Sequence, residues 1–299
     1  MIAYYLFRFF ETLFLALPNS FQRAFILLLA KVAFWIDTKH KKIIKANLDL
    51  TIKDQISEKK YKSILKYCHK NLGLVLLQVL RSSRFSIDDM KKRVRFENRH
   101  YIDDAIKEGR KIIIISAHYG NWELGATAVG ALIHPITSIH KKMNNSYFDD
   151  YLLRSRSKFN MTMVEKKGAI RHLVKALKND QIITMMIDQN VNPKDGIYVD
   201  FLGAKATQSA APAFLARKFD ALIIPILIHT SPEKEDVITV FEPIITANTD
   251  DEEKDILEST QAQADMLSAV IKEHPEPWFC VIKGGSQPIQ RSTSRHQSC

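Results

Sequence analysis

The chain of 299 residues lacks the sequence patterns of several common sites. Its three cysteines, Cys68, Cys280 and Cys299, are odd in number, far apart and never spaced as Cys-x-x-Cys, so we expect free thiols in a reducing compartment. No Gly-x-Gly-x-x-Gly follows a predicted strand, which disfavours a nucleotide-binding oxidoreductase. Ser116 is not in Gly-x-Ser-x-Gly, which disfavours a serine hydrolase, and the histidines have no metal spacing.

Long uncharged runs are also missing. Large apolar residues dominate the first 36 positions, but Arg8, Glu11, Arg23 and Lys31 interrupt them. No run reaches the roughly 18 to 20 residues of a confident membrane-spanning helix, and no small-residue cleavage site of a secretory signal follows. We predict that residues 1–36 form an anchor lying on, or shallowly inserted into, a membrane. An ordinary buried helical hairpin is the alternative.

Positive charge is concentrated in the first third of the chain. Residues 1–110 hold 22 Lys and Arg against 11 Asp and Glu, whereas residues 111–299 hold 21 against 22. A basic block beside an apolar segment suits an anionic surface. Lipid head groups and nucleic acid both provide one, and composition does not choose between them.

The remainder of the chain alternates between strand and helix patterns. Residues 31–84 have helical periodicity, and Lys111–Ser116 is predicted to be a buried central strand because Ile112–Ile115 is an unbroken β-branched run. The other predicted strands are 94–96, 136–139, 161–164, 182–187, 222–228 and 237–241, and the predicted helices are 101–108, 122–132, 147–159, 169–178, 208–219 and 252–273.

This alternation predicts an α/β fold, with an open, mostly parallel sheet and helices on both faces. The membrane-associated helical segment precedes it. We divide the chain into the anchor at 1–36, a catalytic domain at 37–285 and a polar tail at 286–299.

The candidate catalytic residues follow the predicted central strand. In open α/β sheets, ligands bind beyond the carboxyl ends of the strands. His118 comes two residues after Lys111–Ser116, Gly120 allows a tight turn, and Asn121 can cap the next helix, whose first turn carries Glu123. An imidazole can remove a proton from an attacking hydroxyl while a carboxylate orients its ring. We therefore predict His118 as general base and Glu123 as its partner.

Several motifs together resemble one family. His118 and Glu123 lie in SAHYGNWELG, which resembles the His-(four residues)-Asp/Glu motif of the late acyltransferases of lipid A biosynthesis, the lauroyl/myristoyl transferases. Similar landmarks occur in order along nearly the whole chain: Asn47-Leu48, Asn71-Leu72-Gly73, Arg154-Ser-Arg156, Asp188-Gln189, Phe201-Leu-Gly203 with Thr207, and His274-Pro-Glu-Pro-Trp278-Phe279. The chain departs from the family after Trp278, where residues 280–285 replace the usual aromatic, His and Arg or Lys.

The resemblance implies transfer of a fatty acyl chain from an acyl carrier protein thioester to a hydroxyl of a hydroxyacyl chain on a Kdo-bearing lipid A precursor. It implies no metal or cofactor, and no covalent acyl-enzyme. The implied partners are the acyl carrier protein, the anionic lipid and the membrane surface rather than nucleic acid. The implied location is the cytoplasmic face of a Gram-negative inner membrane.

Four further residues are candidates for substrate binding. Arg154 and Arg156 can bind phosphate or stabilise an oxyanion, with a solvated basic helix face as the plainer alternative. Asp188 and Gln189 close a predicted strand and should open onto the same sheet edge as His118, where Asp188 can orient the sugar or an arginine, or cap a turn.

Other functions stay open. A glycerol-phosphate or lysophospholipid acyltransferase shares His-(four residues)-Asp, and a mycobacterial-type mannoside acyltransferase is related to the family. A catalytically silent protein that binds a membrane surface or nucleic acid is the alternative from another class.

Overall fold

The computed structural model of the protein describes residues 1–82, 84–230, 236–279 and 290–291. Its centre is a seven-stranded sheet in the order β1-β9-β8-β2-β5-β3-β4. Five neighbouring strands are parallel, whereas β1 and β9 run antiparallel to them. The strands are β1 (Val94–Glu97), β2 (Ile112–Ser116), β3 (Ile136–His140), β4 (Met161–Glu165), β5 (Ile182–Met186), β8 (Leu222–Thr230) and β9 (Asp236–Val240).

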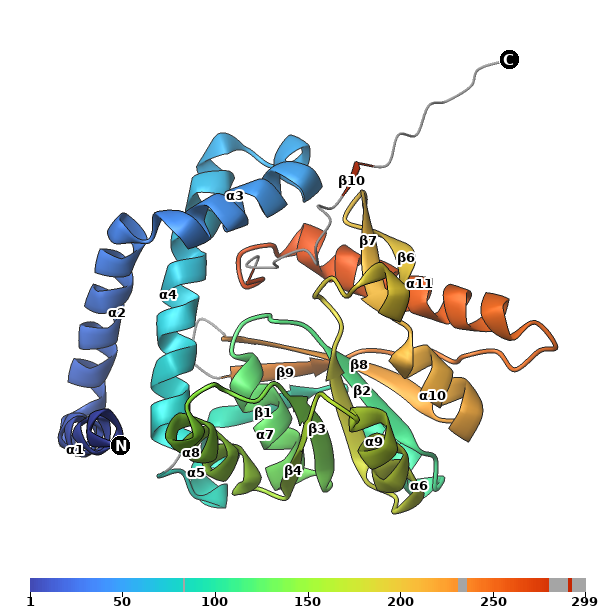
Figure 1. Cartoon of the computed structure of the whole chain (residues 1–299), viewed down its shortest axis with the longest axis horizontal. Coiled ribbons are helices and arrows are strands. Elements are labelled where there is room, and N and C mark those ends of the chain that lie inside the picture. Colours follow the sequence, from blue (N-terminus) through green and yellow to red (C-terminus); the bar gives the residue numbers. More distant parts are fainter. Residues whose placement is uncertain (83, 231–235, 280–289, 292–299) are drawn as a thin grey trace.

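Helices cover both faces of this sheet (Figure 1). Alternate residues of β2 point to opposite faces, so Ile113 and Ile115 join one apolar core while Ile112 and Ile114 join another. The helices after β1 and before the C-terminal region are α6 (His100–Lys107), α7 (Trp122–Leu132), α8 (Ser146–Ser157), α9 (Ala169–Lys178), α10 (Ala211–Phe219) and α11 (Glu252–Glu273). The predicted mostly parallel α/β sheet is therefore confirmed.

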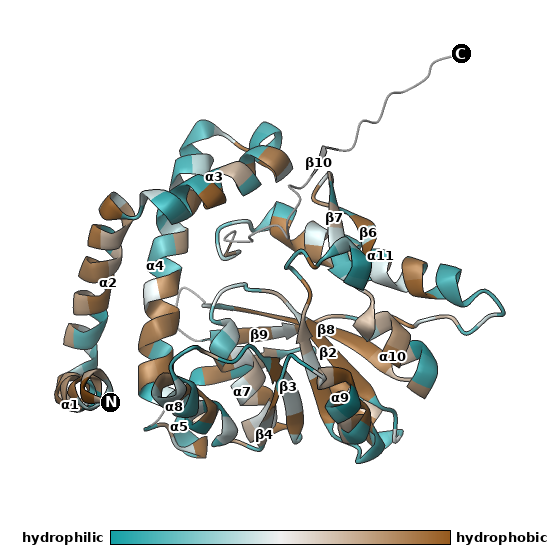
Figure 2. Ribbon diagram, in the orientation of Figure 1, coloured by the Kyte–Doolittle hydropathy of each residue, from teal (hydrophilic) through white to brown (hydrophobic). Residues whose placement is uncertain are grey.

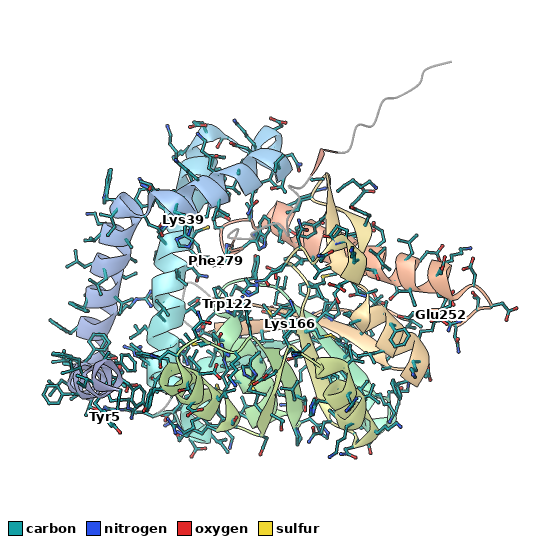
Figure 3. The ribbon with its side chains drawn as sticks, viewed as in Figure 1. Tyr5, Lys39, Trp122, Lys166, Glu252 and Phe279 are labelled. Atoms are coloured by element: carbon teal, nitrogen blue, oxygen red, sulfur yellow. The ribbon has the colours of Figure 1, made fainter. Side chains whose placement is uncertain are left out.

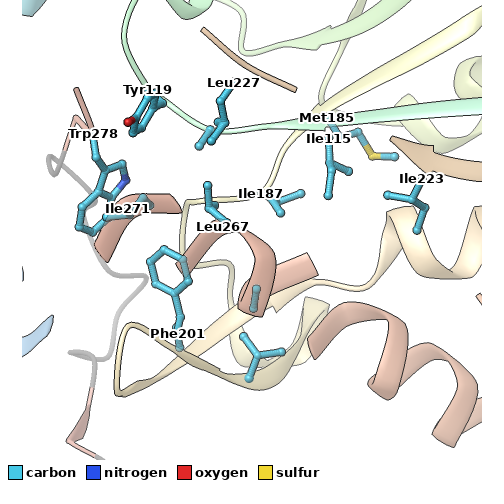
Figure 4. Packing of buried hydrophobic residues seen from close by; sticks show 14 of the residues in the cluster. Ile115, Tyr119, Met185, Ile187, Phe201, Ile223, Leu227, Leu267, Ile271 and Trp278 are labelled. Atoms are coloured by element: carbon cyan, nitrogen blue, oxygen red, sulfur yellow. The ribbon is translucent and has the colours of Figure 1, made fainter. Parts of the chain in front are cut away.

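The first core joins the sheet to the C-terminal part of the described chain. Figure 4 shows Ile115, Met185 and Ile223 of the sheet facing the same cluster as Leu267 of α11 and Trp278. Trp278 is 1% exposed. A large aromatic side chain buried here stabilises the segment that follows α11 against the sheet.

Helices also precede the sheet. They are α1 (Ile2–Ala16), α2 (Asn19–Ile36), α3 (Thr38–Thr51), the short 3-10 helix η1 (Lys53–Gln55), α4 (Glu58–Ser82) and α5 (Ile87–Arg93). In Figure 1, α2 runs beside α4. Arg81 of α4 donates a hydrogen bond to the buried Gln22 of α2 at 2.8 Å, which fixes the two helices to each other.

The predicted N-terminal segment is not a buried hairpin. Of the 25 large apolar residues that are exposed in the described part of the chain, 15 lie within residues 1–36. Figure 2 shows hydrophobic colour over much of α1 and α2. Among the helices that the structure describes, none is long and apolar enough to cross a membrane.

The region from Pro193 to Ser209 was mispredicted as a loop followed by a helix beginning at Gln208. It contains the 3-10 helix η2 (Pro193–Asp195) and a hairpin of β6 (Gly196–Phe201) and β7 (Ala204–Ser209), with β10 (Gln290–Arg291) pairing beside β7. Leu202 and Gly203 form the two-residue turn, both with positive φ of 54° and 82°. Leucine is unusual there, so the turn signal was weak. Helix α10 begins after Gln208, with Pro212 in its first turn.

The predicted boundary at 285/286 and most of the polar tail at 286–299 lie outside the described residues. The other predicted elements occur at their expected places, with ends that differ by a few residues.

Glycine is required in the loop that follows β2. Gly120 has φ of +56°, and a Cβ there would lie 1.9 Å from the carbonyl oxygen of Ile228. We expect Gly120→Ala to lower the free energy of unfolding by about 3 kcal/mol or more, because steric conflict with backbone adds to left-handed strain. Urea unfolding measures this change.

Gly109→Ala is the control for this substitution. Gly109 also has positive φ, but a Cβ there would meet nothing within 4 Å. Its cost should stay near 1 kcal/mol, since only the backbone conformation is unfavourable. Equal losses in the two variants would contradict the close approach at Gly120.

Candidate active site

Two adjacent parallel strands bring the central pair of residues together. His118 follows β2 by two residues, and Asp188 follows β5 by two residues. Ser116 and Met186 are in register at the ends of these strands. The backbone N–H of His118 donates to Asp188 Oδ2 at 2.9 Å, and the ring Nδ1 lies 2.8 Å from Asp188 Oδ1.

This geometry selects one form of the imidazole. An ionised carboxylate only accepts hydrogen bonds, so Nδ1 carries the proton and Nε2 is left as the basic nitrogen. Nε2 lies 3.5 Å from the side-chain nitrogen of Gln189, a long contact. The predicted His118, Asp188 and Gln189 therefore share one sheet edge.

Burial and charge act in opposite directions on the pKa of His118. The side chain is 22% exposed and that of Asp188 is 0% exposed. Burial alone lowers the pKa of His118, but the charge and hydrogen bond of Asp188, with a smaller contribution from Glu123, leave it raised above its usual value. The protonated form of the His118 ring is therefore stabilised at this position.

Glu123 does not take the predicted place on the His118 ring. It lies in the first turn of α7 and pairs with Arg156 of α8 through two hydrogen bonds, of 2.9 and 2.6 Å. The bond to Nδ1 is already made by Asp188. The expectation that Glu123 orients the ring is corrected, because strand pairing brings Asp188 to His118 while α7 directs Glu123 toward α8. Glu123 still acts on His118 through its charge.

The two candidate arginines have different surroundings. Both belong to α8, but Arg156 binds Glu123 whereas Arg154 donates to the hydroxyl of Tyr4 on α1 at 3.2 Å. Only Arg156 is therefore joined to the group around His118.

Asn121 begins α7, but its side chain makes no capping hydrogen bond, contrary to the prediction. Its Oδ1 is buried and has no hydrogen-bond partner among the residues that the structure describes. Asn71 of α4 instead supports this loop, since its Nδ2 donates to the carbonyl oxygen of Gly120 at 2.8 Å.

The segment after α11 contacts the loop from the side opposite α4. Phe279 N–H donates to the carbonyl of His118 at 2.7 Å, and Gly120 N–H donates to the carbonyl of Pro277 at 2.9 Å. The ring of Trp122 contacts both His118 and Phe279. Its centroid lies 5.3 Å from the centroid of the His118 ring and 5.4 Å from that of the Phe279 ring. The Pro-Glu-Pro-Trp landmark thus shapes the site, whereas the departure at residues 280–285 lies outside the described residues.

A small hollow adjoins Asp188. It is lined by Ile187, Asp188, Gln189, Asn190, Phe201, Ala206, Thr207 and Gln208. The hairpin that sequence reasoning missed therefore contributes to the site. Gln208 is 4% exposed, and its Nε2 has no hydrogen-bond partner within the described part of the chain.

Comparison with known proteins places the chain in a family. A model of the bacterial lipid A biosynthesis acyltransferase family matches residues 1–283. The chain therefore belongs to the bacterial lipid A biosynthesis acyltransferase family.

Individual relatives are distant. A lipid A biosynthesis acyltransferase of Haemophilus influenzae is 25% identical over 176 residues, covering 59% of this chain and 55% of the relative. A second one from that organism is 20% identical over 198 residues, covering 65% and 59%. A phosphatidylinositol mannoside acyltransferase of Mycolicibacterium smegmatis is 24% identical over 179 residues, covering 58% and 56%. The chain thus spans little more than half the length of these curated relatives.

The raised pKa of His118 gives a test that needs no substrate. We expect Asp188→Asn to lower the pKa of His118, because the imidazolium loses its nearest negative charge. NMR titration of the His118 ring measures this directly. Glu165→Gln, which removes an exposed carboxylate at the end of β4, is the control and should leave the titration unchanged. An unchanged pKa in Asp188→Asn would exclude the carboxylate as its cause.

Proposed function

We propose that the protein is an O-acyltransferase that moves a fatty acyl chain from an acyl carrier protein thioester to a lipid A precursor. The acceptor is a hydroxyl on a hydroxyacyl chain of the Kdo-bearing precursor. The observation that carries the proposal is the His118 ring, whose Nδ1 bonds Asp188 and whose Nε2 is the basic nitrogen at the sheet edge. Membership of the family supports the same chemistry.

His118 acts as general base in this reaction. Nε2 takes the proton of the acceptor hydroxyl as its oxygen attacks the thioester carbonyl carbon. The carbon–sulfur bond then breaks, and the thiolate of the phosphopantetheine arm leaves and receives the proton from the imidazolium. Asp188 stabilises that imidazolium and holds the ring in place. The base must be neutral, so activity should fall as pH drops through the raised pKa of His118.

Glu123 and Arg156 act as a unit in the proposal. The carboxylate adds negative potential at the imidazolium, and it holds the guanidinium by two hydrogen bonds. Arg156 is suited to meet a phosphate of the precursor or the oxyanion of the tetrahedral intermediate. Gln189 contributes hydrogen bonds at the same edge, whereas the contact of Arg154 with α1 gives it a role outside the chemical step. No metal or cofactor enters the reaction.

A membrane supplies the lipid acceptor. The exposed apolar residues of α1 and α2, here named the apolar face, include Tyr5, Phe9, Phe10, Phe25, Leu28 and Trp35. Exposed apolar surface of this extent is typical of an interaction site. The next helix, α3, carries the exposed Lys39, Lys42 and Lys45. These positive charges can bind anionic lipid head groups. We infer that residues 1–36 insert into the cytoplasmic leaflet of a Gram-negative inner membrane without crossing it.

The acyl-transfer assay is the principal test. Membranes that contain the wild-type protein are incubated with acyl carrier protein thioesters and the Kdo-bearing precursor. Mass spectrometry should detect a product that is heavier than the precursor by one acyl group. His118→Ala and Asp188→Asn should each lower the rate by about 10²- to 10⁴-fold, since each damages general-base catalysis. Glu123→Ala should also lower it, because Arg156 loses its partner.

The acceptor panel decides among the alternatives. Acylation of a lysophospholipid or of glycerol phosphate, with no lipid A product, would keep the chemistry and reject the substrate. The mycobacterial relative makes a mannoside acceptor part of the same panel. No transfer to any acceptor would favour a silent membrane-binding protein, and full activity in His118→Ala would exclude the mechanism.

Membrane binding has its own test. Phe10→Asp should weaken co-sedimentation with vesicles of phosphatidylethanolamine and phosphatidylglycerol by about tenfold or more, because it places a charge on a face that enters the lipid. Phe10 is 63% exposed, so folding should be unaffected. Leu257→Asp, at an exposed apolar position on α11, is the control. Equal binding of both variants would reject the apolar face as the anchor.

A further inference from the structure

Lysines gather at the carboxyl ends of β3 and β4. Lys141 and Lys142 follow β3, and Lys166 and Lys167 follow β4. All four are exposed, and we name them the lysine rim. Residues 140–178 hold ten Lys and Arg against three Asp and Glu, although residues 111–299 together are nearly neutral.

The rim is one continuous feature. Strands β3 and β4 pair in parallel up to His140 and Glu165, and Lys166 N–H donates to the carbonyl of His140 at 2.9 Å. Glu165 lies 3.4 Å from Lys142, with both side chains exposed, so it offsets only one of the four charges. The rim therefore presents net positive charge to solvent.

The rim and the active site occupy the same sheet edge. The order β2-β5-β3-β4 puts β3 two strands and β4 three strands from β2, which is about 10 to 14 Å at the usual spacing between strands. In Figure 3, Lys166 and Tyr5 of α1 are labelled on different sides of Trp122, the residue whose ring contacts His118. If a protein docked at the rim, a flexible prosthetic arm on it could span these two to three strand spacings and reach His118.

Exposed apolar side chains accompany the lysines. Met143 follows Lys142, Met186 ends β5, and Ile170 lies in the first turn of α9, with exposures of 42%, 39% and 45%. Apolar and methionine contacts surrounded by charge are typical of a protein interface, whereas lipid head groups need only the charge. The apolar face of α1 and α2 already provides the bilayer contact.

We propose that the lysine rim is the docking surface for an acidic carrier protein, which holds its thioester on a flexible arm that reaches His118. This proposal rests on the proposed function, because it requires a protein-bound acyl donor. Acidic helices of the carrier would meet the rim, and the opposite charges would speed encounter at low salt.

The test compares a protein-bound donor with a small donor. In Lys166→Glu/Lys167→Glu, the KM for the acyl carrier protein thioester should rise about tenfold or more at low salt, with kcat little changed, because each substitution replaces attraction by repulsion. The increase should shrink at high ionic strength. Transfer from the corresponding acyl pantetheine, which has no protein surface, should be unaffected.

The opposite end of α9 provides the matched control. Lys175→Glu/Lys178→Glu makes the same charge change at exposed positions of the same helix, away from the carboxyl edge of the sheet. This variant should keep the wild-type KM for the carrier. Thermal unfolding of both variants confirms that the fold is retained.

Each remaining outcome has one meaning. An unchanged carrier KM in the rim variant overturns the docking surface and leaves the proposed function intact. Equal losses with both donors, a raised KM for the lipid acceptor alone, or lost vesicle binding with an unchanged carrier KM also overturn it. If the wild-type protein transfers nothing, the proposed function fails. Calorimetry of acylated carrier binding to the wild-type protein and to the rim variant then still tests whether the lysine rim is the docking surface.

Discussion

The site depends on the two hydrogen bonds that the buried Asp188 carboxylate makes to His118. One bond holds the backbone and the other holds the ring, so the position of the loop and the orientation of the imidazole are fixed together. A carboxylate with a fully buried side chain requires such partners, because an unpaired buried charge is strongly unfavourable. The parallel pairing of β2 with β5 supplies that arrangement before any substrate arrives.

Segments far apart in the chain complete the support of this loop. Asn71 binds it from α4, and Pro277 and Phe279 bind it from the region after α11. Backbone groups on the tight turn at Gly120 would otherwise be left without partners on burial. The loop is therefore held on one side by α4 and on the other by the segment after α11.

Local patterns were enough to predict most of the fold. The β-branched run at Ile112–Ile115 identified the central strand, and apolar periodicity within residues 31–84 identified the helical region that contains α4, because both signals depend only on neighbouring residues. The hairpin of β6 and β7 was missed because its turn uses Leu202, whose positive φ is set by the pairing of the two strands rather than by its own preference.

Sequence alone determined that His118 follows a buried strand, that Glu123 lies in the next helix, and that Asp188 and Gln189 follow another strand. The tertiary structure decided which carboxylate contacts the ring. Strand order brings together residues separated by 70 positions, and it is fixed by packing of the whole sheet rather than by local spacing. For that reason Glu123, five residues from His118, pairs with Arg156, while the distant Asp188 holds the imidazole.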